Sequence, residues 1–316
     1  MAQELAIATQ GLTKQFDRHV AVHDVDLQIR TGEVYGLIGP NGAGKTTLIR
    51  MLAAAEEPTL GEIHINGDRL WQNQDDPHLK RQIGYLPDDF PLYDDLTVWD
   101  YLDYFARLYK LREPRRRERL RDVLELVQLT HKRHSQIATL SRGMKQRLSL
   151  ARTIIHEPLV LLLDEPVSGL DPIARMQFRE IIKSLQAAQM TILISSHVLS
   201  DLAELCNSIG IMELGYLVES TTLDHLYQRL SQQQILLTTL GSVADLQAEL
   251  RTCPHVEAVE VLSDGQRVKA TFSGDPTAAA ALLRSLIEAN IPLTEFQPMH
   301  EDLESIFLKL GHKQAS

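Results

Sequence analysis

The sequence predicts an α/β fold with a parallel sheet, and three observations lead to that class. Residues 159–163, 191–195 and 209–212 are apolar runs without alternation, which is typical of strands buried on both faces of a parallel sheet. Helical segments separate the first two runs, as crossover connections between parallel strands require. A further apolar run, residues 33–38, ends in a glycine-rich turn before a helical pattern over residues 45–55. Strand, glycine-rich loop and helix in this order form the context of a phosphate-binding loop.

The remaining patterns divide the chain into a large and a small domain. Alternation over residues 5–13 and 21–29 predicts antiparallel strands at the N-terminus. Apolar residues at helical spacing predict a helical subdomain at about residues 90–150. We therefore expect an α/β P-loop NTPase domain over residues 1–218. A linker is expected over residues 219–233, where glutamine, serine and leucine dominate.

Residues 234–316 predict a small α+β domain after this linker. The order of its first six patterns is βαββαβ, which suggests a ferredoxin-like layer. Asp264 and Gly265 form a hairpin signal between the two middle strands. The strand patterns cover residues 235–240, 256–262, 267–272 and 292–297, and the helical patterns cover residues 243–251, 276–289 and 301–310.

Composition and charge exclude several classes of protein. The net charge of −10 argues against a protein that binds nucleic acid by general phosphate attraction. Cys206 and Cys253 are too few for a disulfide framework and lack metal-ligand spacing, so we expect reduced thiols in a cytoplasmic chain. No stretch reaches the roughly 18–20 apolar residues of a membrane span, and residues 1–10 lack the basic region of a secretory signal. Docking onto a membrane protein remains open.

The glycine-rich turn carries the pattern G-x-x-x-x-G-K-[ST], which is typical of loops that bind ATP or GTP. Its glycines let the backbone wrap the phosphates with several N–H groups pointing inward. Lys45 supplies a positive charge to the β- and γ-phosphates, and Thr46 offers its hydroxyl to Mg²⁺. The alternative is a glycine-rich turn without a ligand. The predicted ATP-binding residues are Gly39, Pro40, Asn41, Gly42, Ala43, Gly44, Lys45, Thr46 and Thr47.

Two acids follow the apolar run of residues 159–163. Asp164 ends that strand at the carboxyl edge of the sheet, where Mg²⁺ needs a partner that acts through water. Glu165 comes next, and a second carboxylate beside the γ-phosphate can polarise an attacking water. The alternative is an acidic strand end that caps a turn before Pro166.

Five motifs in register resemble those of the ATP-binding-cassette (ABC) transporter ATPases, and they cover residues 1–218. The resemblance includes both the order and the spacing of the motifs. They are an aromatic residue that stacks on adenine in the family (Phe16), the signature motif (residues 140–147, LSRGMKQR), the acidic strand end (Asp164 and Glu165), the D-loop (residues 168–171) and the switch histidine (Ser196 and His197).

The resemblance implies a site shared by two chains. In this family two ATPase domains pair head to tail, and each signature motif faces the γ-phosphate bound by the other domain. Ser141 and Gly143 would then act in trans at the start of a helix, and Asp171 would complete the same sandwich. His197 would contact the γ-phosphate and hold the attacking water with Glu165. The alternatives are structural, such as a helix N-cap for Ser141.

Two motifs depart from the pattern of the family. After residues 83–87 (IGYLP) the chain has Asp88, where the family usually has a glutamine that reaches Mg²⁺ and marks the groove of the membrane partner. Asp88 is shorter and charged, but it can still bind Mg²⁺ through water. In the signature motif, Arg142 and Met144 replace the usual glycine and glutamine.

Residues 301–310 resemble the ending of ATPase subunits from ABC-2-type exporters, although an amphipathic packing helix would show the same pattern. The resemblance as a whole implies an ATPase subunit that uses ATP and Mg²⁺ and pairs with itself or with a similar subunit. It would work beneath a separate permease of the ABC-2 type, on the cytoplasmic face of the membrane.

Other functions of the same cassette are an ABC-type ATPase that acts on nucleic acid or ribosomes, and a regulatory ATP-binding module. The single cassette, the lack of a long coiled coil and the acidic charge count against action on nucleic acid. A phosphotransferase that uses the same loop is a third option, and it would need a separate acceptor site.

Overall fold

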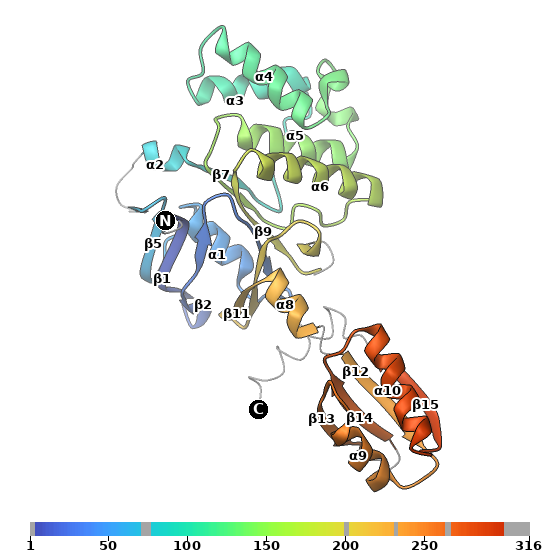
Figure 1. The fold of residues 1–316 in the computed structure, drawn as a ribbon. Coiled ribbons are helices and arrows are strands. Elements are labelled where there is room, and N and C mark those ends of the chain that lie inside the picture. The colour runs from blue at the N-terminus through green and yellow to red at the C-terminus, as the bar shows by residue number, and fades with distance from the viewer. Residues whose placement is uncertain (1–3, 71–76, 199–201, 231–232, 263–266, 300–316) are drawn as a thin grey trace. The chain divides into compact units, whose positions relative to one another are not determined.

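The computed structural model describes residues 4–70, 77–198, 202–230, 233–262 and 267–299 (Figure 1). The chain divides into two compact units, Met1–Leu223 and Asp224–Ser316. Each unit has a hydrophobic core of its own. Of the helices in these described ranges, none combines the length and the apolar character needed to cross a membrane.

The first unit is built on a six-stranded sheet with the order β11-β10-β4-β9-β8-β7. All neighbours from β7 to β10 are parallel, and β11 is antiparallel to β10. Every residue of β4, β8 and β9 is buried, which explains why these segments read as apolar runs rather than alternating ones. The strands are β4 (Val34–Ile38), β7 (Ile83–Leu86), β8 (Val160–Leu163), β9 (Thr191–Ser196), β10 (Ser208–Glu213) and β11 (Tyr216–Thr222). The predicted parallel sheet is therefore confirmed.

An antiparallel sheet at the N-terminus forms a second layer of the first unit. Strand β1 (Leu5–Phe16) pairs with β2 (His19–Val25), β3 (Gln28–Arg30) and β5 (Leu60–Ile65), and β6 (Asp68–Arg69) extends β5. The single strand predicted over residues 21–29 is wrong, because the chain forms β2 and β3 instead. Between them the Asp26 carboxylate accepts a hydrogen bond from the Gly11 N–H at 2.7 Å, and the Leu27 N–H donates to Thr9 Oγ1 at 2.9 Å.

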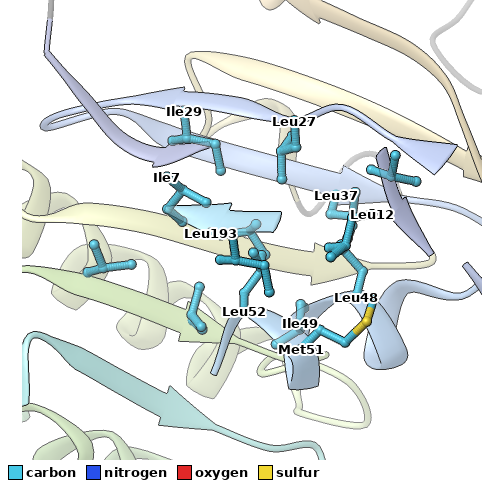
Figure 2. Packing of buried hydrophobic residues seen from close by; sticks show 14 of the residues in the cluster. Ile7, Leu12, Leu27, Ile29, Leu37, Leu48, Ile49, Met51, Leu52 and Leu193 are labelled. Atoms are coloured by element: carbon cyan, nitrogen blue, oxygen red, sulfur yellow. The ribbon is translucent and has the colours of Figure 1, made fainter. Parts of the chain in front are cut away.

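The main core lies between the two sheets and holds helix α1 (Lys45–Leu52) in place (Figure 2). Ile7 and Leu12 come from β1, and Leu37 and Leu193 come from the parallel sheet. The side chains of α1 that enter this core are Leu48, Ile49, Met51 and Leu52. Because α1 begins at the end of the glycine-rich loop, the core fixes where that loop lies.

Helices cover the remaining part of the first unit. Helices α3 and α4 lie away from the N-terminal sheet, in the predicted helical subdomain, and α5 lies beside α6 (Figure 1). Ser141 and Asp171 are the N-caps of α5 and α6, each accepting a backbone N–H with its side chain. The helices given for the described residues of this unit are α1, α2 (Pro77–Arg81), α3 (Val98–Leu108), α4 (Arg115–Leu126), α5 (Arg142–Ile154) and α6 (Pro172–Ala187), with short 3₁₀ turns at Thr130–Lys132 and Ile137–Thr139.

The second unit carries a four-stranded antiparallel sheet with the order β13-β14-β12-β15. Its described elements are α8 (Leu223–Leu230), β12 (Gln233–Thr239), α9 (Val243–Thr252), β13 (Val256–Val261), β14 (Arg267–Phe272), α10 (Pro276–Glu288) and β15 (Leu293–Met299). After α8 they follow the strand and helix order predicted from the sequence. The hairpin signal at Asp264 and Gly265 and the predicted helix over residues 301–310 lie outside the described residues.

The predicted linker over residues 219–233 is wrong. Residues 219–222 belong to β11, which pairs with β10, and α8 begins at Leu223. The predicted domain boundary after residue 218 therefore lies too early, since the first compact unit extends to Leu223. Polar residues mark this segment as a linker in the sequence, but an edge strand exposes one face to water and tolerates the same composition.

Candidate active site

The glycine-rich loop between β4 and α1 is held by backbone atoms of two other strands. Gly44 caps α1 with φ +100, and a Cβ there would lie 2.3 Å from the Ala21 carbonyl oxygen. A Cβ at Gly39 would lie 2.3 Å from the Met212 carbonyl oxygen. The glycines are therefore required by the close approach of β2 and β10, as well as by the left-handed backbone at Gly44.

A pocket of about 380 Å³ opens above this loop. Its size lies in the range of small-molecule sites, about 300–1,000 Å³. Four segments meet in it, namely the β1–β2 hairpin, the loop with α1, the segment after β7 and the segment after β8. Its lining residues are Phe16, His19, Ala21, Asn41, Gly42, Ala43, Gly44, Lys45, Thr46, Thr47, Asp88 and Glu165. Of these, His19 and Ala21 were not predicted, although both lie next to Phe16 in the hairpin that the sequence places at the N-terminus.

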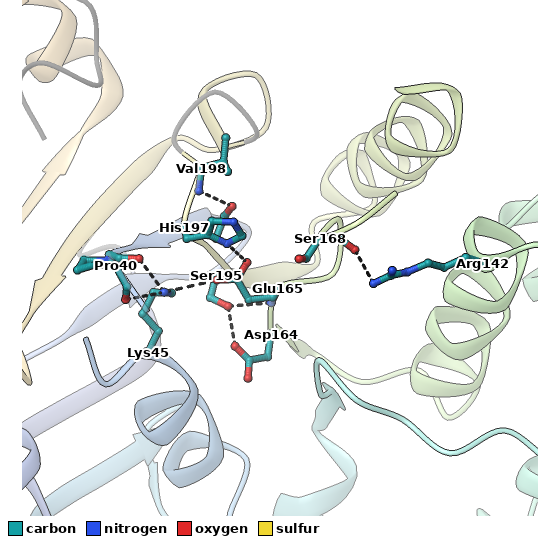
Figure 3. Close-up of polar contacts among 11 residues, drawn as sticks. Pro40, Lys45, Arg142, Asp164, Glu165, Ser168, Ser195, His197 and Val198 are labelled. Atoms are coloured by element: carbon teal, nitrogen blue, oxygen red, sulfur yellow. Dashed lines mark hydrogen bonds and ion pairs between the residues drawn. The ribbon is translucent and has the colours of Figure 1, made fainter. Parts of the chain in front are cut away.

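Lys45 and Glu165 are charged residues that line the pocket, and Figure 3 shows how their side chains lie. The Lys45 ammonium donates to the carbonyl oxygens of Gly39 at 2.7 Å and Pro40 at 3.2 Å, and it lies 3.4 Å from Glu165 Oε1. The other oxygen of Glu165 lies 2.8 Å from His197 Nδ1. Glu165 has a left-handed backbone with φ +47. Residues other than glycine rarely adopt this conformation, and it is often found at functional sites. Lys45 and His197 thus each lie close to a different oxygen of the Glu165 carboxylate.

Asp164 lies behind Glu165 and is almost completely buried, at 1% exposure. Ser195, at the end of β9, donates its hydroxyl to Asp164 Oδ1 at 2.7 Å and accepts the Glu165 N–H at 2.9 Å. Sequence reasoning missed Ser195, although a hydroxyl residue at the carboxyl end of an apolar strand was a usable signal. Among the described residues, Asp164 Oδ2 has no hydrogen-bond partner. A buried carboxylate oxygen without a partner fits a hydrated divalent cation, which would satisfy it through water.

The described residues contain no group of three or more His, Cys, Asp or Glu that could hold a metal ion by themselves. This is compatible with Mg²⁺, which keeps several waters and binds through one or two carboxylates together with substrate phosphates. Thr46 and Asp88 line the same pocket as the loop. The donors present therefore fit a magnesium–nucleotide complex better than a metal held by protein ligands alone.

The pKa of Asp88 departs from its ordinary value. Partial burial and the neighbouring Asp164 and Glu165 carboxylates raise the pKa of Asp88 above its ordinary value. The Arg142 guanidinium acts in the opposite direction. The structure therefore places Asp88 within reach of the field of both acids, at the edge of the pocket.

The signature residues and the D-loop lie apart from the pocket of their own chain. Ser141 Oγ accepts the Met144 N–H at 3.3 Å, and Asp171 Oδ1 accepts the Ala174 N–H at 2.9 Å. A Cβ at Gly143 would lie 2.5 Å from Ala174 Cβ, so close packing of α5 on α6 requires this glycine. Within the described part of the chain, none of Ser141, Gly143 and Asp171 lines the pocket.

Comparison with known proteins agrees with this geometry. The family model described as ABC transporter matches residues 22–168. The chain is 35% identical to the uncharacterized ABC transporter ATP-binding protein YxlF of Bacillus subtilis (strain 168), over 97% of this chain and 99% of that protein. It is 32% identical to the bacitracin transport ATP-binding protein BcrA of Enterococcus faecalis, over 98% of this chain and 97% of that protein.

Solved structures lead to the same family. The structure of an ATP-binding subunit of an ABC transporter is 32% identical and superposes with a TM-score of 0.63, covering 71% of this chain and 92% of that one. Family match, relatives over nearly the full length, fold and phosphate loop all agree. The chain therefore belongs to the ABC transporter family, as an ATP-binding subunit with ATPase activity.

Proposed function

We propose that this chain drives an exporter, as one of two ATPase subunits that pair head to tail beneath a separate permease of the ABC-2 type. The chain would then lie on the cytoplasmic face of a membrane without crossing it. The Enterococcus faecalis relative is a bacitracin transport ATP-binding protein, which supports an exporter of a related kind. ATP would close the pair, hydrolysis would reopen it, and the permease would follow these changes.

One observation carries the catalytic part of this proposal, namely the position of Glu165 between Lys45 and His197. Lys45 is held by loop carbonyl oxygens and is close enough to turn toward the phosphates of bound ATP. Glu165 would accept a proton from the attacking water, and His197 would orient that carboxylate and contact the γ-phosphate. Phe16 is 42% exposed at the pocket and would stack on adenine.

Mg²⁺ would be held by the Thr46 hydroxyl and, through water, by Asp164 and Asp88. When bound, it would neutralise charge on the β- and γ-phosphates. The chain's own contribution is to hold Asp164 rigid through Ser195, because a buried hydrogen bond fixes the carboxylate that faces the cation.

The position of the signature motif supports pairing of two chains. The N-terminus of α5 exposes Ser141 at the start of a helix, where backbone N–H groups and the helix dipole attract anions. Since this helix end does not line the pocket of its own chain, we infer that a second copy would use it to contact the γ-phosphate. Asp171 would contribute from the neighbouring D-loop.

The test is the ATPase activity of the purified chain together with its association state. We expect hydrolysis of MgATP that is lost in Lys45→Ala and in Glu165→Gln, and that persists in the matched surface variant Glu180→Gln, whose side chain is 60% exposed. Glu165→Gln should also form an ATP-dependent dimer in sedimentation experiments. Activity that survives Lys45→Ala or Glu165→Gln would overturn the mechanism. Failure of the chain to co-purify with a membrane protein encoded beside it would overturn the exporter assignment.

A further inference from the structure

The first turn of α5 carries two cations at a place where the helix dipole opposes positive charge. Arg142 is the first residue of this helix and Lys145 is its fourth, whereas the first turn contains no acid. The N-terminal end of a helix has partial positive charge and favours anions instead. Two cations at this position therefore need compensating partners elsewhere in the fold.

The partners of these cations lie in two different segments. The Lys145 ammonium lies 2.9 Å from Asp94 Oδ1, in the segment between β7 and α3. Arg142 contacts another segment, because its Nη2 donates to the Ser168 carbonyl oxygen at 3.2 Å (Figure 3). One turn of helix thus contacts both the segment that follows Asp88 and the D-loop.

Arg142 also packs closely against the backbone of the D-loop. Gly169 has φ +66, and a Cβ there would lie 2.6 Å from Arg142 Nη1. The guanidinium therefore occupies the space that a side chain at position 169 would need. The contact joins a planar, always charged group to a carbonyl oxygen and a glycine, which a lysine cannot reproduce.

We propose that Arg142 is a positioning residue that ties the start of α5 to the D-loop. This inference rests on the proposed function, in which Ser141, Gly143 and the D-loop together meet the nucleotide of a second copy. Because Arg142 is held by a carbonyl oxygen of its own chain, it keeps the two segments at a constant separation. A partner's nucleotide then meets both segments already in place, which lowers the ordering cost of pairing.

The test follows backbone hydrogen exchange at Ser168 and Leu170, whose N–H groups bond to Glu165 and Val167 carbonyl oxygens. Arg142→Ala should speed this exchange by about fivefold or more in the nucleotide-free chain, because local opening becomes easier. Lys145→Ala is the matched control, since it removes a cation of the same turn that contacts Asp94 rather than the D-loop. Equal exchange in the wild-type chain and in Arg142→Ala would overturn the inference.

Two further measurements separate this role from others. In a Glu165→Gln background, Arg142→Ala should weaken ATP-dependent dimerisation about tenfold, while the affinity of the monomer for a fluorescent ATP analogue changes less than about twofold. Weakened dimerisation with unchanged D-loop exchange would instead indicate direct contact with the partner's phosphates and overturn the proposal.

Failure of the proposed function would look different. In that case the Glu165→Gln chain with Arg142 intact would not dimerise with ATP at all. The exchange experiment on the nucleotide-free chain would still show whether Arg142 holds the D-loop.

Discussion

Ser195 joins the two acids of the candidate active site through one hydroxyl group. Its Oγ donates to Asp164 Oδ1 at 2.7 Å and accepts the Glu165 N–H at 2.9 Å. Ser195 is completely buried, so water cannot replace the hydroxyl after a Ser195→Ala substitution. The substitution therefore leaves a carboxylate oxygen and a backbone N–H without their partners.

The expected loss follows from these two bonds. A hydrogen bond to a charged group contributes about 1.5–3 kcal/mol, and one between neutral groups contributes about 0.5–1.5 kcal/mol. Ser195→Ala should thus lower the free energy of unfolding by about 3 kcal/mol. For a unit of this size the unfolding midpoint should fall by about 6–12 °C. Both acids also lose a contact that fixes their position, and we expect this to cost about 1.4 kcal/mol of transition-state stabilisation. Turnover should therefore fall roughly tenfold.

Thermal unfolding and steady-state MgATP hydrolysis measure the two effects. The matched control is Ser196→Ala at the adjacent position. The Ser196 hydroxyl accepts the Val198 N–H at 3.0 Å, and among the described residues it has no hydrogen bond to either acid. This control should lose about 1 kcal/mol, the contribution of one neutral hydrogen bond. If Ser195→Ala is as stable and as active as Ser196→Ala, the shared hydroxyl does not hold the acids and our account of the site is wrong.

Three other substitutions test separate parts of the site, and Gly67→Ala is the matched control for the first of them. Gly44→Ala places a methyl carbon 2.3 Å from the Ala21 carbonyl oxygen and should abolish nucleotide binding in an equilibrium titration. Gly67 has φ +85, but a Cβ added there would meet no atom within 4 Å. Gly67→Ala should therefore lower the free energy of unfolding by only about 1–2 kcal/mol. Because the pKa of Asp88 is raised in the folded state, ionised Asp88 destabilises the fold. Asp88→Asn should therefore raise the unfolding midpoint at neutral pH. This gain should vanish when the pH falls below the pKa that Asp88 has in the folded and in the unfolded chain, because the carboxyl is then neutral in both. A gain that persists in acid would contradict this explanation. Phe16→Ala should weaken ATP binding about tenfold with little change in stability, since stacking on a base contributes about 1–3 kcal/mol; unchanged affinity would refute stacking.

The local patterns of the sequence were reliable where burial is uniform. The apolar runs at residues 33–38, 159–163 and 191–195 became β4, β8 and β9, because strands covered on both faces exclude polar side chains. The phosphate loop was equally readable, since strand, loop and helix are consecutive in the chain. By contrast, the segment at residues 219–222 became β11 through pairing with β10, and composition does not encode pairing of this kind.

The functional roles of individual side chains divide in a similar way. The sequence singles out Lys45, Glu165 and His197, and the structure brings the three together around one carboxylate. The link between Arg142 and the D-loop is not visible in the sequence, because it joins two helix starts that are distant in the chain.

By itself, the sequence determined the fold class, the order of most elements and the residues that could bind a nucleotide. These follow from short-range patterns of burial and from the fixed spacing of a phosphate loop. Only the tertiary structure decided that Ser195 holds Asp164 and Glu165, and that the carbonyl oxygens of Ala21 and Met212 leave room only for glycine in the loop. The physical reason is that packing of separate strands brings these groups together, and the strands are farther apart in the sequence than a local pattern spans.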